Sequence, residues 1–143
     1  MARYRTIVPS LWDDAWFSEQ SARVKLAWFY LLTNTFTTPS GIYQLNQKIA
    51  QVYLGFDEAA WVRVFEKIAK DGKAVVEDEW ILIPNYIRHQ PSPAPTVWRL
   101  ILKQVAEAPE KLQKVWHEHN DDRLPIAYRY PIDSPSGISL ETE

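Results

Sequence analysis

Apolar residues between positions 18 and 34 recur with the period of an α-helix. One side of this helix carries residues at helical spacing: Val24, Ala27, Trp28, Leu31 and Leu32. Ser18 can cap its first turn, and Phe29 and Tyr30 extend its apolar surface almost all the way round. Because a helix that is apolar on nearly every side is usually buried, we expect this segment to lie at the centre of the core.

A very short strand is predicted at 42–45, and a second helix follows it over residues 47–56. Asn46 can cap this helix, and Gly55 can end it. Three of its residues are expected to face inward: Ile49, Val52 and Tyr53. A third helix is predicted over 58–71, between a cap at Asp57 and a left-handed stop at Gly72.

A hairpin over residues 74–83 follows the third helix at once, with an acidic turn at 77–79. The order helix, strand, helix, helix, hairpin is that of a winged helix-turn-helix, in which the helix at 58–71 is the recognition helix and the hairpin is the wing. Four large residues of these elements are expected to share one core: Trp28, Trp61, Phe65 and Leu82.

The predicted fold class is therefore mainly α with a small β-hairpin, a winged helix-turn-helix followed by two C-terminal helices and an extended tail. We expect a winged-helix domain at 1–90, a Pro-rich connector at 91–96 and a C-terminal helical segment at 97–120. The Pro-, Ser- and Asp-rich composition of 121–143 predicts an extended or disordered tail.

Three cations gather on one side of the predicted recognition helix. Arg63, Lys67 and Lys70 fall within about 60° of the helix circumference, at 100° per residue. They lie opposite an apolar arc formed by Trp61, Val62, Val64, Phe65, Ile68 and Ala69. A basic stripe on this helix predicts contact with DNA, although Lys and Arg on any exposed helix can form a merely solvated face.

Several further residues are candidates for DNA contact because they can hydrogen-bond or pair with phosphate. Those beside the recognition helix are Lys48, Lys73, Asn46, Gln47 and Gln51. On the N-terminal arm, Arg3 and Arg5 can follow a groove, or they can simply keep the chain soluble. The acidic wing turn, Glu77, Asp78 and Glu79, should repel phosphate, so we expect its tip to stay clear of the DNA backbone.

The composition is that of an ordinary globular domain of 143 residues with a formal net charge of −2. The segment from Asp121 to the last residue holds five acids and two Arg, so the negative balance comes from there. The absence of cysteine excludes disulfides, thiolate metal sites and a Cys nucleophile. Neither a signal peptide nor a run of about 20 apolar residues is present, which predicts a cytoplasmic protein that does not enter a membrane.

Three stretches resemble the N-terminal winged-helix domain of DnaD-like replisome-organiser and replication-initiator proteins of phages and prophages. They are "PSLWDDAWFSEQSARVKLAWFYLLTN", "GIYQL" and "IPNYIRHQPSP", within residues 3–93. The resemblance implies binding to double-stranded DNA in the bacterial cytoplasm. As further partners we expect replication proteins or a second copy of the chain, a homo-oligomer.

No catalytic or phosphate-binding motif is found in the sequence. It contains no Gly-rich phosphate loop and no Gly-x-Ser-x-Gly or His-Glu-x-x-His motif, and His117 and His119 point to different sides of a helix. We therefore expect a non-enzymatic protein with no cofactor and no metal. Two other functions stay open: a winged-helix transcriptional regulator, and a winged-helix adaptor that binds only other proteins.

Overall fold

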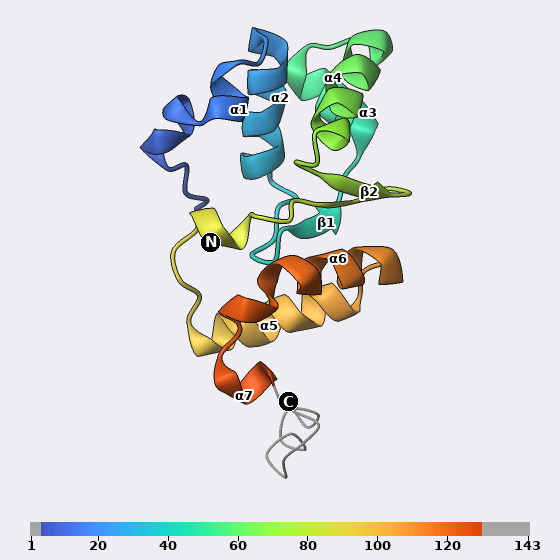
Figure 1. Ribbon diagram of the computed structural model, residues 1–143. Coiled ribbons are helices and arrows are strands. Elements are labelled where there is room, and N and C mark those ends of the chain that lie inside the picture. Colours follow the sequence, from blue (N-terminus) through green and yellow to red (C-terminus); the bar gives the residue numbers. More distant parts are fainter. Residues whose placement is uncertain (1–3, 130–143) are drawn as a thin grey trace.

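The computed structural model describes residues 4–129 of the chain, and Figure 1 shows their arrangement. The α-helices are α1 (Ala15–Ser18), α2 (Ala22–Thr33), α3 (Gln47–Leu54), α4 (Glu58–Lys70), α5 (Pro95–Ala106), α6 (Glu110–Asn120) and α7 (Ile126–Arg129). The 3₁₀ helices are η1 (Pro9–Asp13), η2 (Ile87–His89) and η3 (Asp121–Arg123), and the strands are β1 (Ile42–Gln44), β2 (Val75–Glu77) and β3 (Trp80–Leu82). The winged-helix order α2, β1, α3, α4, β2–β3 is confirmed, and so is the mainly helical fold class.

The predicted hairpin is part of an antiparallel sheet of three strands in the order β1-β3-β2. Leu82 of β3 lies opposite Ile42 on one side and Val75 on the other. The hairpin turn requires a residue in the left-handed region, and Asp78 supplies it with φ 54°. Asp is one of the few residue types that adopt this region at low cost, which explains an acid in the turn without reference to a ligand.

Both faces of the sheet are covered by helices. On one face, Tyr43 and Ile81 pack with Trp28 of α2 and Trp61 of α4. On the other face, Ile42 and Leu82 pack with side chains of α5 and α6, among them Trp98, Ile101, Leu112 and Trp116. Figure 1 shows the sheet between these two layers of helices. The prediction that Leu82 shares a core with Trp28 and Trp61 is therefore wrong, because successive strand residues point to opposite faces.

Local sequence signals set most helix boundaries as expected. Asn46 and Asp57 cap α3 and α4, and Gly55 ends α3 in the left-handed region with φ 73°. The cap of α2 is Ser21 rather than Ser18, since the Ser21 hydroxyl accepts the Val24 N–H at 3.3 Å. Ser18 ends the separate short helix α1.

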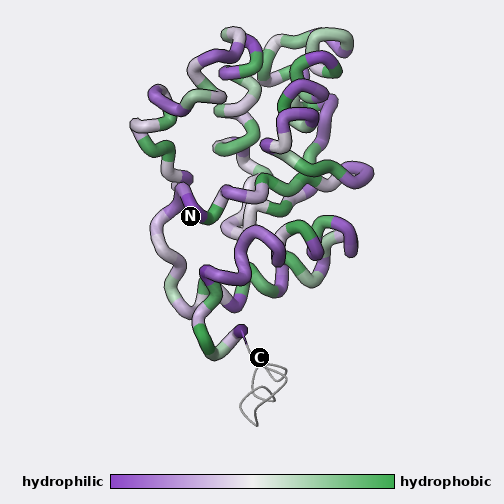
Figure 2. Tube along the Cα trace, in the orientation of Figure 1, coloured by the Kyte–Doolittle hydropathy of each residue, from purple (hydrophilic) through white to green (hydrophobic). Residues whose placement is uncertain are grey.

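The inward-facing residues of α3 were predicted wrongly in part. Val52 and Tyr53 are 77% and 70% exposed. Ala50 is fully buried in their place, and Leu54 packs against the core. Figure 2 shows that hydrophobic and hydrophilic residues alternate along the helices, as is typical of helices with one buried side.

The C-terminal helices are tied to the sheet layer by polar contacts as well as by packing. The Trp116 indole N–H donates to the Ser40 carbonyl at 2.9 Å, and the Asn120 amide donates to the Pro84 carbonyl at 3.2 Å. The tail was predicted to be extended or disordered from residue 121, but residues 121–129 contain η3, α7 and the buried Leu124. Its remainder, 130–143, lies outside the described residues.

No helix within the described part of the chain is long and apolar enough to cross a membrane.

Candidate nucleic-acid interface

The basic stripe of α4 lies on the exposed side of this helix. Arg63, Lys67 and Lys70 are exposed, while Trp61, Val64 and Ile68 on the opposite side are buried. Val62, predicted to face the core, is exposed as well, because the buried arc is narrower than the apolar sequence suggests. Glu66 is also exposed, and its helical position lies between those of Val62 and Lys70. The surface that α4 presents is therefore mixed in charge, with its cations between the middle of the helix and its C-terminal end.

Lys67 belongs to a network within the protein. Its ammonium lies 2.8 Å from the Asp71 carboxylate, and the Trp16 indole N–H donates to the same oxygen at 2.8 Å. The hydrogen bond from Lys67, with that from Trp16, lowers the pKa of Asp71. A phosphate must compete with Asp71 for Lys67, so this lysine is a weaker candidate than the sequence suggests.

Arg63 and Lys70, unlike Lys67, are not held in an ion pair by any residue that the structure describes. Within residues 4–129, neither side chain has a hydrogen-bond or ion-pair partner. Lys73, just beyond α4, lies with its ammonium 5.1 Å from the centre of the Trp16 ring, a cation–π contact that leaves its N–H donors available. The basic surface with donors to spare thus consists of Arg63, Lys70 and Lys73.

The N-terminal end of α4 is less suited to phosphate. Lys48 of α3 lies 3.7 Å from the Glu58 carboxylate, so the charges of these two exposed groups largely offset each other. The Asp57 carboxylate adds a further negative charge at this end, where it caps the helix by accepting the Ala60 N–H at 2.8 Å.

The polar candidates on α3 have structural tasks. The Asn46 side chain accepts the Ile49 N–H at 3.0 Å, and the Gln47 side-chain oxygen accepts the Trp61 indole N–H at 2.7 Å. Gln47 thus links α3 to α4. Gln51 is half-buried and, in the part of the chain that the structure describes, makes no side-chain hydrogen bond.

The N-terminal arm is attached to the body instead of extending away from it. Arg5 donates to the Thr37 hydroxyl at 2.9 Å and to the Thr37 carbonyl at 2.8 Å. The next residue, Thr6, exchanges two hydrogen bonds with the Gln90 side chain, at 2.9 and 3.0 Å. Arg5 is therefore committed to holding the arm in place, and Arg3 lies outside the described residues.

The acidic wing is paired in part with a C-terminal helix. Lys111 of α6 lies 3.4 Å from the Glu77 carboxylate and donates to the Val76 carbonyl at 3.4 Å. Asp78 and Glu79 at the tip are exposed and, among residues 4–129, have no side-chain partner. One of the three wing acids thus has a partner inside the chain, which sequence reasoning did not foresee.

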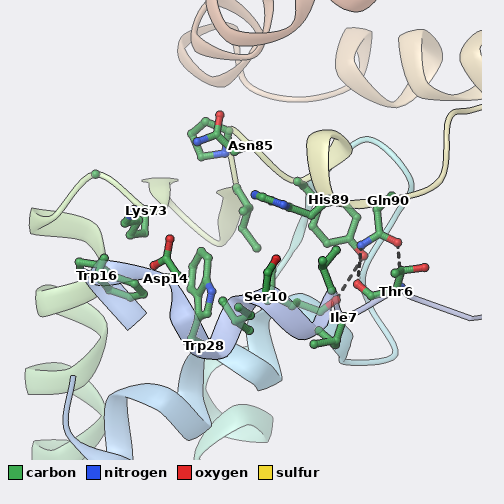
Figure 3. Close-up of a pocket in the computed structure, with 17 residues that line it drawn as sticks. Thr6, Ile7, Ser10, Asp14, Trp16, Trp28, Lys73, Asn85, His89 and Gln90 are labelled. Atoms are coloured by element: carbon green, nitrogen blue, oxygen red, sulfur yellow. Dashed lines mark hydrogen bonds between the residues drawn. The ribbon is translucent and has the colours of Figure 1, made fainter. Parts of the chain in front are cut away.

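A cavity of about 140 Å³ lies beneath the N-terminal arm, as Figure 3 shows. Its apolar wall includes Leu11, Trp28 and Leu32, and its exposed rim includes Ser10, Asn85 and His89. A cavity of about 150 Å³ can hold a benzene ring, so this one has room for a single group of that size. No sequence signal pointed to it, because its walls come from segments far apart in the chain.

Two charged residues also line the cavity. The Asp14 carboxylate accepts the Phe17 N–H at 2.8 Å and so caps α1, while Lys73 contacts the Trp16 ring. Asp14 therefore already has a role in the fold.

No group of three or more His, Asp or Glu side chains that could hold a metal ion occurs among the residues that the structure describes. Comparison of the chain with models of known protein families, with curated proteins and with solved structures found no match.

Proposed function

We propose that this chain is a non-enzymatic, winged-helix protein that binds double-stranded DNA through the exposed side of α4, from Arg63 at the middle of the helix to Lys70 at its end. The observation that carries the proposal is the position of Arg63 and Lys70. Both are exposed on the helix that enters the major groove in winged-helix complexes, and within residues 4–129 neither has a hydrogen-bond or ion-pair partner. Lys73, half-buried just beyond the C-terminal end of this helix, is a further cation.

The distribution of charge limits the proposed contact to a small area. Glu66 lies within the exposed side of α4, and Glu58 offsets Lys48 at its N-terminal end. Few phosphates can then be neutralised, so binding should be of modest affinity and should depend on salt with a small slope.

The role proposed for DNA binding is the initiation or organisation of phage or prophage replication in the bacterial cytoplasm. The support for this role is the resemblance of residues 3–93 to replisome-organiser proteins, together with the matching order of elements. A phage transcriptional regulator is the alternative that uses the same DNA contact.

A second candidate function is that of a protein–protein adaptor. It is favoured by Asp78 and Glu79, two exposed acids at the wing tip. They form an acidic surface that suits a basic partner protein better than phosphate. A winged helix that serves only as an adaptor has no need for duplex DNA.

Fluorescence anisotropy with a labelled random duplex, at low and at moderate salt, tests the proposal. We expect binding at low salt that weakens at moderate salt and is lost when Arg63 and Lys70 are both changed to Glu. Absence of binding at low salt would refute DNA binding and leave the adaptor. A regulator, unlike a general organiser, should also prefer one short site over random duplex by about 10³ or more in competition.

A further inference from the structure

Helix α2 has an outward face that is apolar and only partly covered. Its buried side is formed by Val24, Ala27, Trp28 and Leu31. On the opposite side, Leu26 is 48% exposed, and Phe29 and Tyr30 are half-buried where they pack against the core. A helix that is apolar all round is normally enclosed, but the described residues of this chain leave the Leu26 side of α2 partly open.

Aromatic side chains from two neighbouring elements continue this face. Trp12 of η1 is 61% exposed and contacts Phe29, with ring centres 5.8 Å apart. Tyr53 of α3 contacts Tyr30 at 6.3 Å. Since Phe29 and Tyr30 are three and four residues from Leu26, they are its neighbours on the helix surface. We call this surface the α2 band: Trp12, Leu26, Phe29, Tyr30 and Tyr53.

The order of side chains across the α2 band follows from these contacts and from helix geometry. Leu26 lies between two aromatic pairs, Trp12 with Phe29 and Tyr30 with Tyr53. An exposed aliphatic side chain flanked by aromatic side chains along a helix is suited to an amphipathic helix, which presents apolar residues at i, i+3, i+4 and i+7.

Two cations lie beside the N-terminal end of the band. The Arg23 guanidinium lies 5.8 Å from the Phe56 ring, and the Lys25 ammonium lies 5.8 Å from the Phe17 ring. Within residues 4–129 neither has a carboxylate partner. The N-terminal end of α2 adds the positive end of the helix dipole. This end of the band therefore favours carboxylates in whatever covers it.

We propose that the α2 band docks an amphipathic helix of a partner protein, with its apolar side on Leu26 and its acidic residues over Arg23 and Lys25. A second copy of α2 fits less well, because its sequence, ARVKLAWFYLLT, contains two cations and no acid. The inference goes beyond DNA binding and does not depend on it, since α2 and α4 expose different surfaces.

Two synthetic peptides test whether the α2 band docks an acidic amphipathic helix. Each has about 15 residues, the length at which an isolated helix begins to form. The first has Leu at i, i+3, i+4 and i+7 and Glu residues toward its C-terminal end; the second has Lys in place of each Glu. We expect the Glu peptide to bind about tenfold more tightly than the Lys peptide, as followed by anisotropy of a label on the peptide.

Matched variants locate the binding. Leu26→Asp should abolish it, whereas Leu100→Asp on α5, where the leucine is 45% exposed, should leave it unchanged. The double change Arg23→Glu and Lys25→Glu should reverse the preference toward the Lys peptide. Circular dichroism verifies that each variant is folded. If Leu26→Asp loses peptide binding but keeps its affinity for duplex DNA, the test of the α2 band is independent of the test of DNA binding.

Three results would overturn the inference. Equal binding of both peptides would show general apolar adsorption, and binding of neither would show that the band does not dock a helix of this chemistry. Concentration-dependent dimerisation that Leu26→Asp removes, measured by sedimentation, would assign the band to a second copy of the chain.

Discussion

The basic surface of α4 makes a quantitative prediction about salt. If Arg63 and Lys70 each contact one phosphate, changing both to alanine removes two contacts and leaves the buried side of α4 untouched. The plot of the logarithm of the duplex association constant against the logarithm of the salt concentration should then become shallower by about 1.8, since each contact contributes about 0.9.

This change in slope also predicts how the ratio of the duplex affinities of the unchanged protein and the variant depends on salt. Between about 50 and 200 mM salt the concentration rises fourfold, so the ratio of their affinities should shrink by about 12-fold over that range. Lys67 is expected to contribute less than a full contact, because Asp71 must first release it.

Anisotropy titrations at four or five salt concentrations measure both slopes. The matched control is the double change Lys103→Ala and Arg123→Ala, which removes one Lys and one Arg from exposed positions on α5 and η3. This control alters the net charge equally and should change the slope by much less. Equal slopes for the α4 variant and the unchanged protein would show that Arg63 and Lys70 form only a solvated face.

Three further predictions concern the fold and the wing. Trp61→Ala should lower the free energy of unfolding, measured by urea denaturation, by about 3–5 kcal/mol, because the side chain is buried in the core between the sheet, α2 and α4; a loss below about 1 kcal/mol would contradict that packing. Gly41→Ala should destabilise more than Gly55→Ala, since both have positive φ but only at Gly41 would a Cβ lie 2.7 Å from Tyr86 Cβ; equal melting temperatures would contradict this. Neutralising residues 77–79 to the amides should raise duplex affinity by less than about tenfold, whereas a larger gain would place the wing tip on the DNA backbone.

The features that the sequence predicted correctly rest on short-range interactions. The caps at Asn46 and Asp57 involve residues three positions apart, and the left-handed conformation of Gly72 depends on the absence of a side chain. The exposed cations of α4 could be located because this helix has one strongly polar and one strongly apolar side. These are properties of a single segment.

The features that were missed depend on packing between distant segments. Arg5 bonds to Thr37, 32 residues away, and the Glu77 carboxylate is paired with Lys111 of α6. The expected exposure of these charges could not be corrected without the tertiary structure. Tyr53 was misplaced for a related reason, since α3 buries Ala50 and leaves the larger side chain outside.

One stretch of the sequence does indicate the second core. The run Trp80–Ile83 is apolar at every position, whereas a strand with one face in water alternates. A continuous apolar run indicates that both faces are covered, and the second cover is α5 with α6.

The central position of β3 has a consequence for how the protein opens. This strand has neighbours along both edges, and its residues Ile81 and Leu82 are fully buried in different cores. Its backbone amides can exchange with solvent only when their hydrogen bonds to β1 or β2 break, and the helices packed on both faces of the sheet oppose this opening. We therefore expect the amide hydrogens of β3 to exchange most slowly, at the free energy of global unfolding, while those of α7 exchange through local fraying. Such a sheet couples the two layers into one cooperative unit. Detaching α5 and α6 from the sheet therefore also destabilises the packing of α4 on its other face.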